Sequence, residues 1–269
     1  MRRNGGFMTV KKVFVCENSI DGIFTAIYDA WNSRHGHSNI KIELQSEDGS
    51  KNYELFSEYI TVKTDSEKAS KVEKSIKSKI SQQAYEYVFT ASCSDEKEKG
   101  DFIYRFLILG FSMGQSVVDY LGNDIVSKIF DMNRNLNNEV HHFLGFVRFH
   151  EIENGILYSK ICPKNDVLRH LAPHFSDRMN TENFIIYDEK RKTAIFHQTG
   201  FSWIYTYADS LNLSKLEQLS VQENEFQELW KAFFESIAIK ERQNYKLQRN
   251  NLPIRFRNNM LEFDNTKKN

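Results

Sequence analysis

The stretch GFVRFHEIENGILYSKI, residues 145–161, decides the expected fold. Its first part, residues 146–152, alternates apolar and polar side chains with the period of two that is typical of a half-buried strand. Turn formers follow at 153–155, and residues 156–161 resume a strand pattern, which predicts a β-hairpin. Because a hairpin joins antiparallel neighbours, the stretch favours an α+β fold with a mainly antiparallel sheet over a doubly wound parallel one.

Downstream of this hairpin, the pattern predicts further strands and two helices. The expected elements are a helix over residues 166–175, strands over 184–187, 193–197 and 201–205, and a long C-terminal helix over 223–240. The last helix carries a heavy apolar stripe at helical spacing, which we interpret as core. The stripe consists of Leu229, Trp230, Phe233, Phe234 and Ile237.

Upstream of the hairpin, the middle third of the chain is predicted to be helical. Apolar residues recur at i, i+3, i+4 and i+7 over residues 84–92, 101–113 and 119–142. Gly145 is well placed to cap the last of these helices, since glycine adopts a left-handed conformation at the lowest cost.

The first third of the chain mixes strands and helices. Residues 12–16 and 59–64 read as strands, a turn with capping residues over 18–22 leads into a helix expected over residues 23–31, and Asp65 is expected to cap a helix that ends near residue 81. Residues 32–52 are polar and irregular and are expected to form a loop.

These elements predict one α+β domain over residues 12–263. A disordered leader over 1–11 and a disordered tail over 264–269 are expected at the ends, and Met8 is an alternative start to Met1. A soft boundary near residues 115–122 is the alternative to a single domain.

Composition excludes several classes of protein. Lysine and arginine number 36, as do aspartate and glutamate, so a nucleic-acid site requires clustered rather than excess positive charge. No run reaches the roughly 18 apolar residues that span a bilayer. Three scattered cysteines provide neither a disulfide framework nor a CxxC pair. We therefore expect a soluble cytoplasmic protein that is not associated with a membrane.

The densest group of candidate catalytic residues lies at the end of the helical third. Glu139, His141 and Arg148 fall within eleven residues of sequence, together with His142. A histidine titrates near neutral pH and an arginine fork fits a phosphate, so these residues are candidates for a polar pocket with acid–base chemistry. The alternative is that a histidine near a helix C-terminus only complements the helix dipole.

A second candidate group contains His174 and Arg178, close to Pro173 and Asp177. His174 is a candidate catalytic residue and Arg178 a candidate phosphate ligand. The alternatives are a helix cap and a surface ion pair of little energy.

No metal or cofactor is predicted. His170 and His174 are four residues apart and could share a helical face, but no nearby cysteine or carboxylate completes a zinc site. There is no P-loop, GxGxxG, HExxH or GxSxG motif.

A basic C-terminal stretch, residues 240–259, is the best candidate for contact with nucleic acid. Six basic residues face one acid, and Tyr245 and Phe256 are interleaved with them as stacking platforms. The alternative is a solvated helix end. The candidate phosphate-binding residues are Arg242, Asn244, Gln248, Arg249, Arg255 and Arg257.

Taken together, these segments resemble a bacterial family that is associated with DNA metabolism and DNA repair and is otherwise a domain of unknown function. The resemblance runs from about residue 13 to residue 263. It is carried by residues 15–31, 139–149, 171–178, 186–188 and 229–234, and by Arg242, Gln243, Asn244, Gln248 and Pro253.

Members of this family stand beside a radical-SAM protein that acts on DNA, or are fused to a uracil-DNA-glycosylase-like domain. The resemblance therefore implies a DNA repair or modification role together with a radical-SAM partner. This chain lacks the glycosylase domain and the CxxxCxxC motif, so neither activity carries over.

The expected function is DNA or nucleotide binding through the basic C-terminal segment and the pocket of Glu139, His141, Arg148, His174 and Arg178. The alternatives are a non-catalytic adaptor for the radical-SAM partner and a metal-dependent hydrolase. The residues leave both an enzyme and a non-enzyme open.

Overall fold

The computed structural model describes residues 10–46, 53–208, 216 and 218–263. By its internal contacts the chain divides into two compact units, residues 1–137 and residues 138–269, with the boundary inside helix α5 (Asp124–Phe146). That residues 12–263 form one domain stays a prediction. Residues 1–9 of the expected leader and the expected tail lie outside the described residues, whereas Lys11 already belongs to the first strand.

Unit 1 contains a three-stranded parallel sheet in the order β2–β1–β3. The central strand β1 (Lys11–Cys16) pairs in parallel with β2 (Ile40–Leu44) and with β3 (Ser57–Thr61). Helix α1 (Ile20–Asn32) separates β1 from β2 along the chain, and such a crossover returns the next strand parallel to the first. The expectation of a mainly antiparallel sheet is therefore wrong for this unit.

Strand β2 lies within the residues that were expected to form a loop. It has only five residues, and its two buried side chains, Ile40 and Ile42, give too short an alternation to stand out among polar neighbours. The 3₁₀ helix η1 (His37–Asn39) precedes it.

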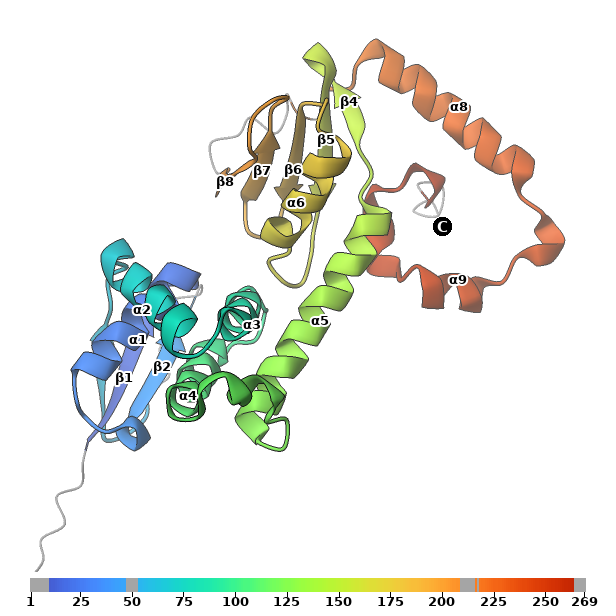
Figure 1. The fold of residues 1–269 in the computed structure, drawn as a ribbon. Helices are drawn as coiled ribbons and strands as arrows, with labels where there is room; N and C mark the ends of the chain where they lie inside the picture. The colour runs from blue at the N-terminus through green and yellow to red at the C-terminus, as the bar shows by residue number, and fades with distance from the viewer. Residues whose placement is uncertain (1–9, 47–52, 209–215, 217, 264–269) are drawn as a thin grey trace, which may run out of the picture. The chain divides into compact units, whose positions relative to one another are not determined.

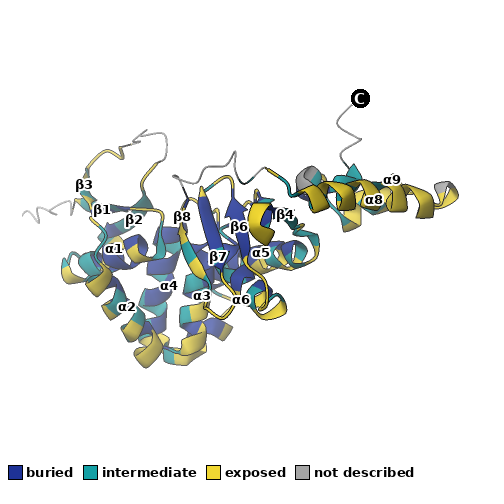
Figure 2. Ribbon diagram, turned by 90° about the horizontal axis from the view of Figure 1, so that it is seen from above, coloured by how far each residue is buried: buried dark blue, intermediate teal, exposed yellow. Residues whose placement is uncertain are grey.

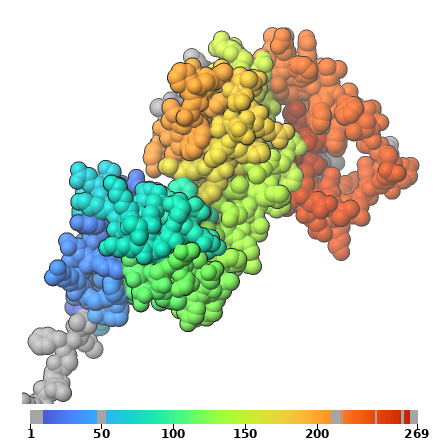
Figure 3. Space-filling view, in the orientation of Figure 1, coloured from blue at the N-terminus to red at the C-terminus, as the bar shows by residue number. Residues whose placement is uncertain are grey.

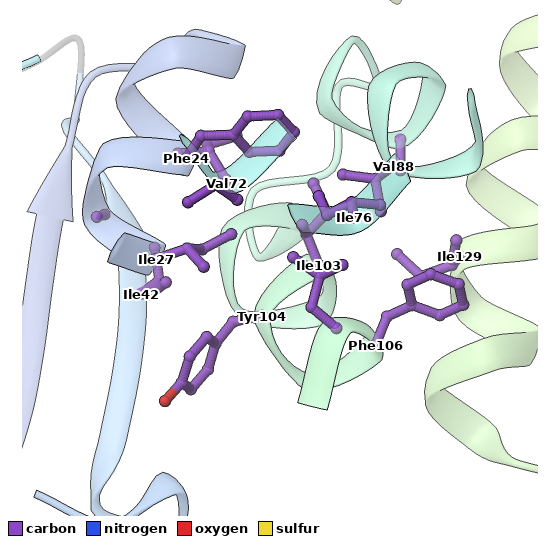
Figure 4. Close-up of a cluster of buried hydrophobic side chains, with 14 of the residues drawn as sticks. Phe24, Ile27, Ile42, Val72, Ile76, Val88, Ile103, Tyr104, Phe106 and Ile129 are labelled. Atoms are coloured by element: carbon purple, nitrogen blue, oxygen red, sulfur yellow. The ribbon is translucent and has the colours of Figure 1, made fainter. Parts of the chain in front are cut away.

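The predicted helices of unit 1 are present. They are α1, α2 (Ser66–Lys79), α3 (Gln82–Ser92), α4 (Lys99–Met113) and the first half of α5, whereas the 3₁₀ helix η2 (Gly114–Asp119) between α4 and α5 was not predicted. Asp65 caps α2 as predicted, accepting hydrogen bonds from the backbone N–H groups of Glu67 and Lys68. Figure 4 shows the core between these elements. The core residues labelled there are Phe24, Ile27, Ile42, Val72, Ile76, Val88, Ile103, Tyr104, Phe106 and Ile129.

Unit 2 contains a mixed five-stranded sheet in the order β4–β5–β6–β7–β8 (Figure 1). The strands are β4 (His150–Ile152), β5 (Ile156–Ile161), β6 (Phe184–Asp188), β7 (Thr193–His197) and β8 (Ile204–Tyr207). The predicted hairpin of β4 and β5 is antiparallel as expected, although β4 begins at His150 rather than at residue 146, and β6 and β7 form a second antiparallel pair. Between them, helix α6 (Leu168–Arg178) forms a crossover that makes β5 and β6 parallel, so this sheet is mixed rather than mainly antiparallel.

The β4–β5 hairpin turns through the short 3₁₀ helix η3 (Glu153–Gly155), where Asn154 and Gly155 adopt positive φ angles of 68° and 70°. Asparagine and glycine tolerate this left-handed conformation best, which is why the turn falls here.

After β8 the chain continues through α8 (Val221–Ile237), η4 (Lys240–Arg242), α9 (Tyr245–Asn251) and η5 (Ile254–Asn259). The expected long C-terminal helix is wrong in its extent, because α8 ends at Ile237 and the last α-helix, α9, has seven residues. In the described part of the chain, no helix is both long and apolar enough to cross a membrane.

Candidate functional site

Glu139 lies on the second half of α5, and its side chain is buried, with the residue 2% exposed. Its Oε1 accepts a hydrogen bond from the backbone N–H of Lys164 at 2.9 Å. Its Oε2 accepts two from Asn165, one from the backbone N–H at 2.8 Å and one from Nδ2 at 2.7 Å. The Arg255 guanidinium lies 3.6 Å from Oε1. Charge-assisted bonds of this kind are strong, so Glu139 anchors the loop after β5 to α5.

This geometry bears on the expected catalytic role of Glu139. Both carboxylate oxygens already have partners from the protein, and a general base needs a lone pair directed at its substrate. The contacts favour a structural role, and catalysis by Glu139 stays a prediction without support from them.

Arg148 lies just after the end of α5. Its Nη1 donates hydrogen bonds to the carbonyl oxygens of Gly145 (2.9 Å) and Val147 (3.3 Å), and its Nη2 lies 3.5 Å from Oε1 of Glu262. Gly145 itself is inside the helix, so its predicted capping role is wrong, and the arginine side chain satisfies the terminal carbonyl groups instead.

The candidate histidines His141 and His174 are both exposed, as is Arg178. His141 faces His142 at a ring distance of 6.4 Å, and His174 contacts the edge of Phe175 at 5.2 Å. Among the described residues, no hydrogen bond, ion pair or ring contact joins His141, His174 or Arg178 to one another or to Glu139. The contacts therefore do not assemble the expected pocket.

Two other histidines are half-buried, and burial lowers the pKa of both. These are His150 on β4 and His170 on α6. Within the described ranges, no group of three or more histidine, cysteine or acidic side chains could hold a metal ion. The hydrolase alternative based on His170 and His174 thus gains no third ligand there.

The basic C-terminal segment separates into engaged and free side chains. Arg255 pairs with Glu139 and stacks 4.6 Å from the Phe256 ring, and Arg257 donates to the carbonyl oxygen of Leu252 at 2.8 Å. Asn244 caps α9 by accepting from the N–H of Leu247 at 3.0 Å.

Three other described cations of the segment are available to a ligand. Arg242, Lys246 and Arg249 are exposed and form no ion pair with any other described residue, and Gln248 is half-buried beside them on α9. Among the described side chains of this segment, these keep the phosphate-binding role open without breaking an internal contact.

Helix α8 overturns the interpretation of its apolar stripe as core. None of its residues is buried, and Figure 2 colours the helix mainly as exposed. The five stripe residues, and Phe226 in addition, are 38% to 65% exposed. They are Phe226, Leu229, Trp230, Phe233, Phe234 and Ile237. We call this set the α8 face; in the space-filling view, α8 is part of the orange segment that follows β8 (Figure 3).

The polar side of α8 is acidic, and its N-terminus is fixed to the sheet. Glu225, Glu228 and Glu235 are exposed along the helix. Ser220 caps the first turn through its hydroxyl, and Glu223 accepts a hydrogen bond from the backbone N–H of Glu151 at 3.0 Å. The helix is therefore anchored at one end, while no described part of the chain buries the α8 face.

A family model matches residues 97–262, which is more than half of the chain. Its description is a domain of unknown function, DUF4130. The chain belongs to the DUF4130 family. No curated protein matches the chain.

All candidate residues from Glu139 to Arg257 fall within the range that matches DUF4130, and so does the α8 face. The parallel sheet of unit 1 precedes that range. The family name assigns no chemistry, so function has to be argued from the exposed side chains. The sequence contained the signal for the α8 face, namely a stripe at helical spacing, but not the information that no other described segment covers it.

Proposed function

We propose that this chain is an accessory protein of DNA metabolism that binds a protein partner through the α8 face. The carrying observation is an α-helix of 17 residues that exposes large apolar side chains along one side and buries none. Helices of this length are only marginally stable alone in water, and most gain their stability by packing an apolar side. Exposed apolar patches of this kind are typical of interaction sites.

The charges around the α8 face define the partner. Glu225, Glu228 and Glu235 flank it, which disfavours phosphate backbones and anionic membranes, since both repel carboxylates. The same like-charge repulsion disfavours pairing with α8 of a second copy. The fitting occupant is a protein with an apolar groove rimmed by lysine or arginine, which binds an amphipathic helix lengthwise.

The DNA-metabolism setting and the identity of the partner rest on the family resemblance. A radical-SAM protein that acts on DNA is the partner it implies, and the adaptor role fits a chain whose candidate catalytic residues do not contact one another.

The test is a binding titration with such a purified radical-SAM protein, measured by interferometry. Aromatic side chains at the centre of an interface often contribute about 2 kcal/mol or more, so we expect Trp230→Ala with Phe233→Ala to weaken binding at least roughly 30-fold. Glu225→Lys with Glu228→Lys should weaken it and remove its salt dependence.

Asn224→Ala is the matched control, because this exposed residue lies on the side of α8 opposite the stripe and should leave the affinity unchanged. Equal affinity of the aromatic variant and the wild type would refute the proposal. If light scattering shows that the wild type is a dimer and the aromatic variant a monomer, the α8 face binds a second copy of this chain rather than another protein.

A second candidate function, DNA contact, is supported by the free cations Arg242, Lys246 and Arg249. If these bind phosphates, DNA affinity should fall steeply with salt, and Arg242→Ala with Arg249→Ala should lower the slope of log affinity against log salt by about 1 to 2. Arg257→Ala is the control, because its guanidinium is already bonded to Leu252. Salt-independent binding would exclude this role.

A further inference from the structure

Helices α1 and α2 of unit 1 pack side by side (Figure 1). A groove of about 610 Å³ is lined by residues of both helices and of the end of α4. This volume falls within the range of small-molecule sites. The groove lies almost wholly before the DUF4130 match and far along the chain from α8, so it is independent of the proposed function.

Aromatic rings form part of the groove wall. Tyr28 and Trp31 come from successive turns of α1, and Phe111 comes from the last turn of α4. Trp31 and Phe111 meet edge to face with ring centroids 5.2 Å apart, which fixes their orientation. All three rings remain partly exposed, so a flat apolar ligand can reach them.

Three cations surround these rings, and no carboxylate lines the groove among the described residues. They are Arg34, just after α1, and Lys71 and Lys79 on α2. Lys71 lies 5.9 Å from the centre of the Tyr28 ring. All three are exposed, and none forms an ion pair within the described ranges.

The acidic residues next to the groove do not neutralise its positive charge, because they pair with other lysines. Asp29 on α1 is neutralised by Lys68 at 2.7 Å, and Glu73 on α2 by Lys77 at 2.6 Å. These two carboxylates, which adjoin the lining residues Tyr28 and Val72 in the sequence, are therefore already paired, while the cations of the groove repel one another until an anion binds.

We propose that this groove binds a nucleoside phosphate, with the base stacked on Trp31 or Tyr28 and the phosphate held by Arg34, Lys71 and Lys79. Base stacking on aromatic side chains combined with phosphate contacts to lysine and arginine is the chemistry of single-stranded nucleic-acid and nucleotide sites. The source is a free nucleotide or a nucleotide of a single strand, and both present the same ring and phosphate.

The test uses the full-length protein with a fluorescein-labelled oligo(dT) and, separately, with AMP and ATP as competitors. We expect Lys71→Ala with Lys79→Ala to weaken binding at least about tenfold and to lower the single-strand salt slope by about 1.4, from two lost phosphate contacts. Bound base should also quench tryptophan fluorescence, and Trp31→Phe should abolish the quench while retaining affinity.

Lys74→Ala is the matched control, because Lys74 is exposed on α2 but does not line the groove. If AMP or ATP displaces the oligonucleotide with a similar affinity, the ligand is a free nucleotide. If the protein binds the oligonucleotide but neither AMP nor ATP, the ligand is a single strand. Both outcomes support the proposed site. No binding of any probe, equal losses from Lys74→Ala, or a loss caused by Arg249→Ala but not by the groove variants would overturn it.

Discussion

Replacing Glu139 by alanine removes the acceptor that joins the loop after β5 to α5. Three hydrogen bonds are lost, two of them from the buried Asn165, and a hydrogen bond to a charged group contributes about 1.5 to 3 kcal/mol. The ion pair with Arg255 adds less than about 1 kcal/mol, because that guanidinium is half exposed. We expect unit 2 to lose about 3 kcal/mol or more of its free energy of unfolding.

Urea unfolding followed by circular dichroism measures this loss, and amide hydrogen exchange locates it. The backbone amides of Lys164 and Asn165 should exchange much faster in Glu139→Ala, whereas amides of β1 should not change. Asp177→Ala, an exposed carboxylate on α6, is the control and should stay within about 0.5 kcal/mol of the wild type. A loss below about 1 kcal/mol with unchanged exchange would refute the anchoring role and return Glu139 to the candidates for acid–base chemistry.

Two further predictions concern stability. Burial lowers the pKa of His150 and His170, so the unfolded chain takes up protons at a higher pH than the folded chain, and the free energy of unfolding should fall as the pH drops through about 6.5. Urea titrations at a series of pH values measure this dependence, and His170→Gln should make it less steep. An unchanged pH dependence in that variant would contradict the prediction. A Cβ at Gly22 would lie 2.6 Å from the carbonyl oxygen of Glu17, whereas one at Gly145 would meet nothing within 4 Å. In the same assay, Gly22→Ala should therefore lower the free energy of unfolding by about 1 to 3 kcal/mol, and Gly145→Ala should raise it by about 0.5 to 1 kcal/mol. Similar effects of the two substitutions would contradict the steric argument.

Local sequence patterns predicted the elements but not how the strands pair. Asp65 as a cap and the turn at Asn154–Gly155 depend on neighbouring residues, and both predictions were confirmed. The direction of β6 relative to β5 depends on where α6 packs, which is a tertiary property. Periodicity alone therefore overestimated the antiparallel content.

The candidate site shows the same division. Sequence placed Glu139 and Arg255 in separate groups, one catalytic and one phosphate-binding, although their side chains form an ion pair. It also assigned the α8 stripe to a core, because an amphipathic pattern shows that a helix has an apolar side but not what lies against it. The groove of unit 1 was missed because its residues come from three helices, with no motif in any one of them.

Helix α5 belongs to both compact units, and this restricts how the gene can be divided. Its first half supplies Val126, Ile129 and Met132 to the core of unit 1, and its second half supplies Phe143 to a core of unit 2. Dividing the gene after residue 137 would give two fragments, and each would contain only half of α5. The DUF4130 range starts at residue 97, within the sequence of unit 1, and keeps α5 whole. The range that matches the family and the range of the compact unit therefore begin at different residues. A fragment for expression of unit 2 alone should start upstream of Asp124.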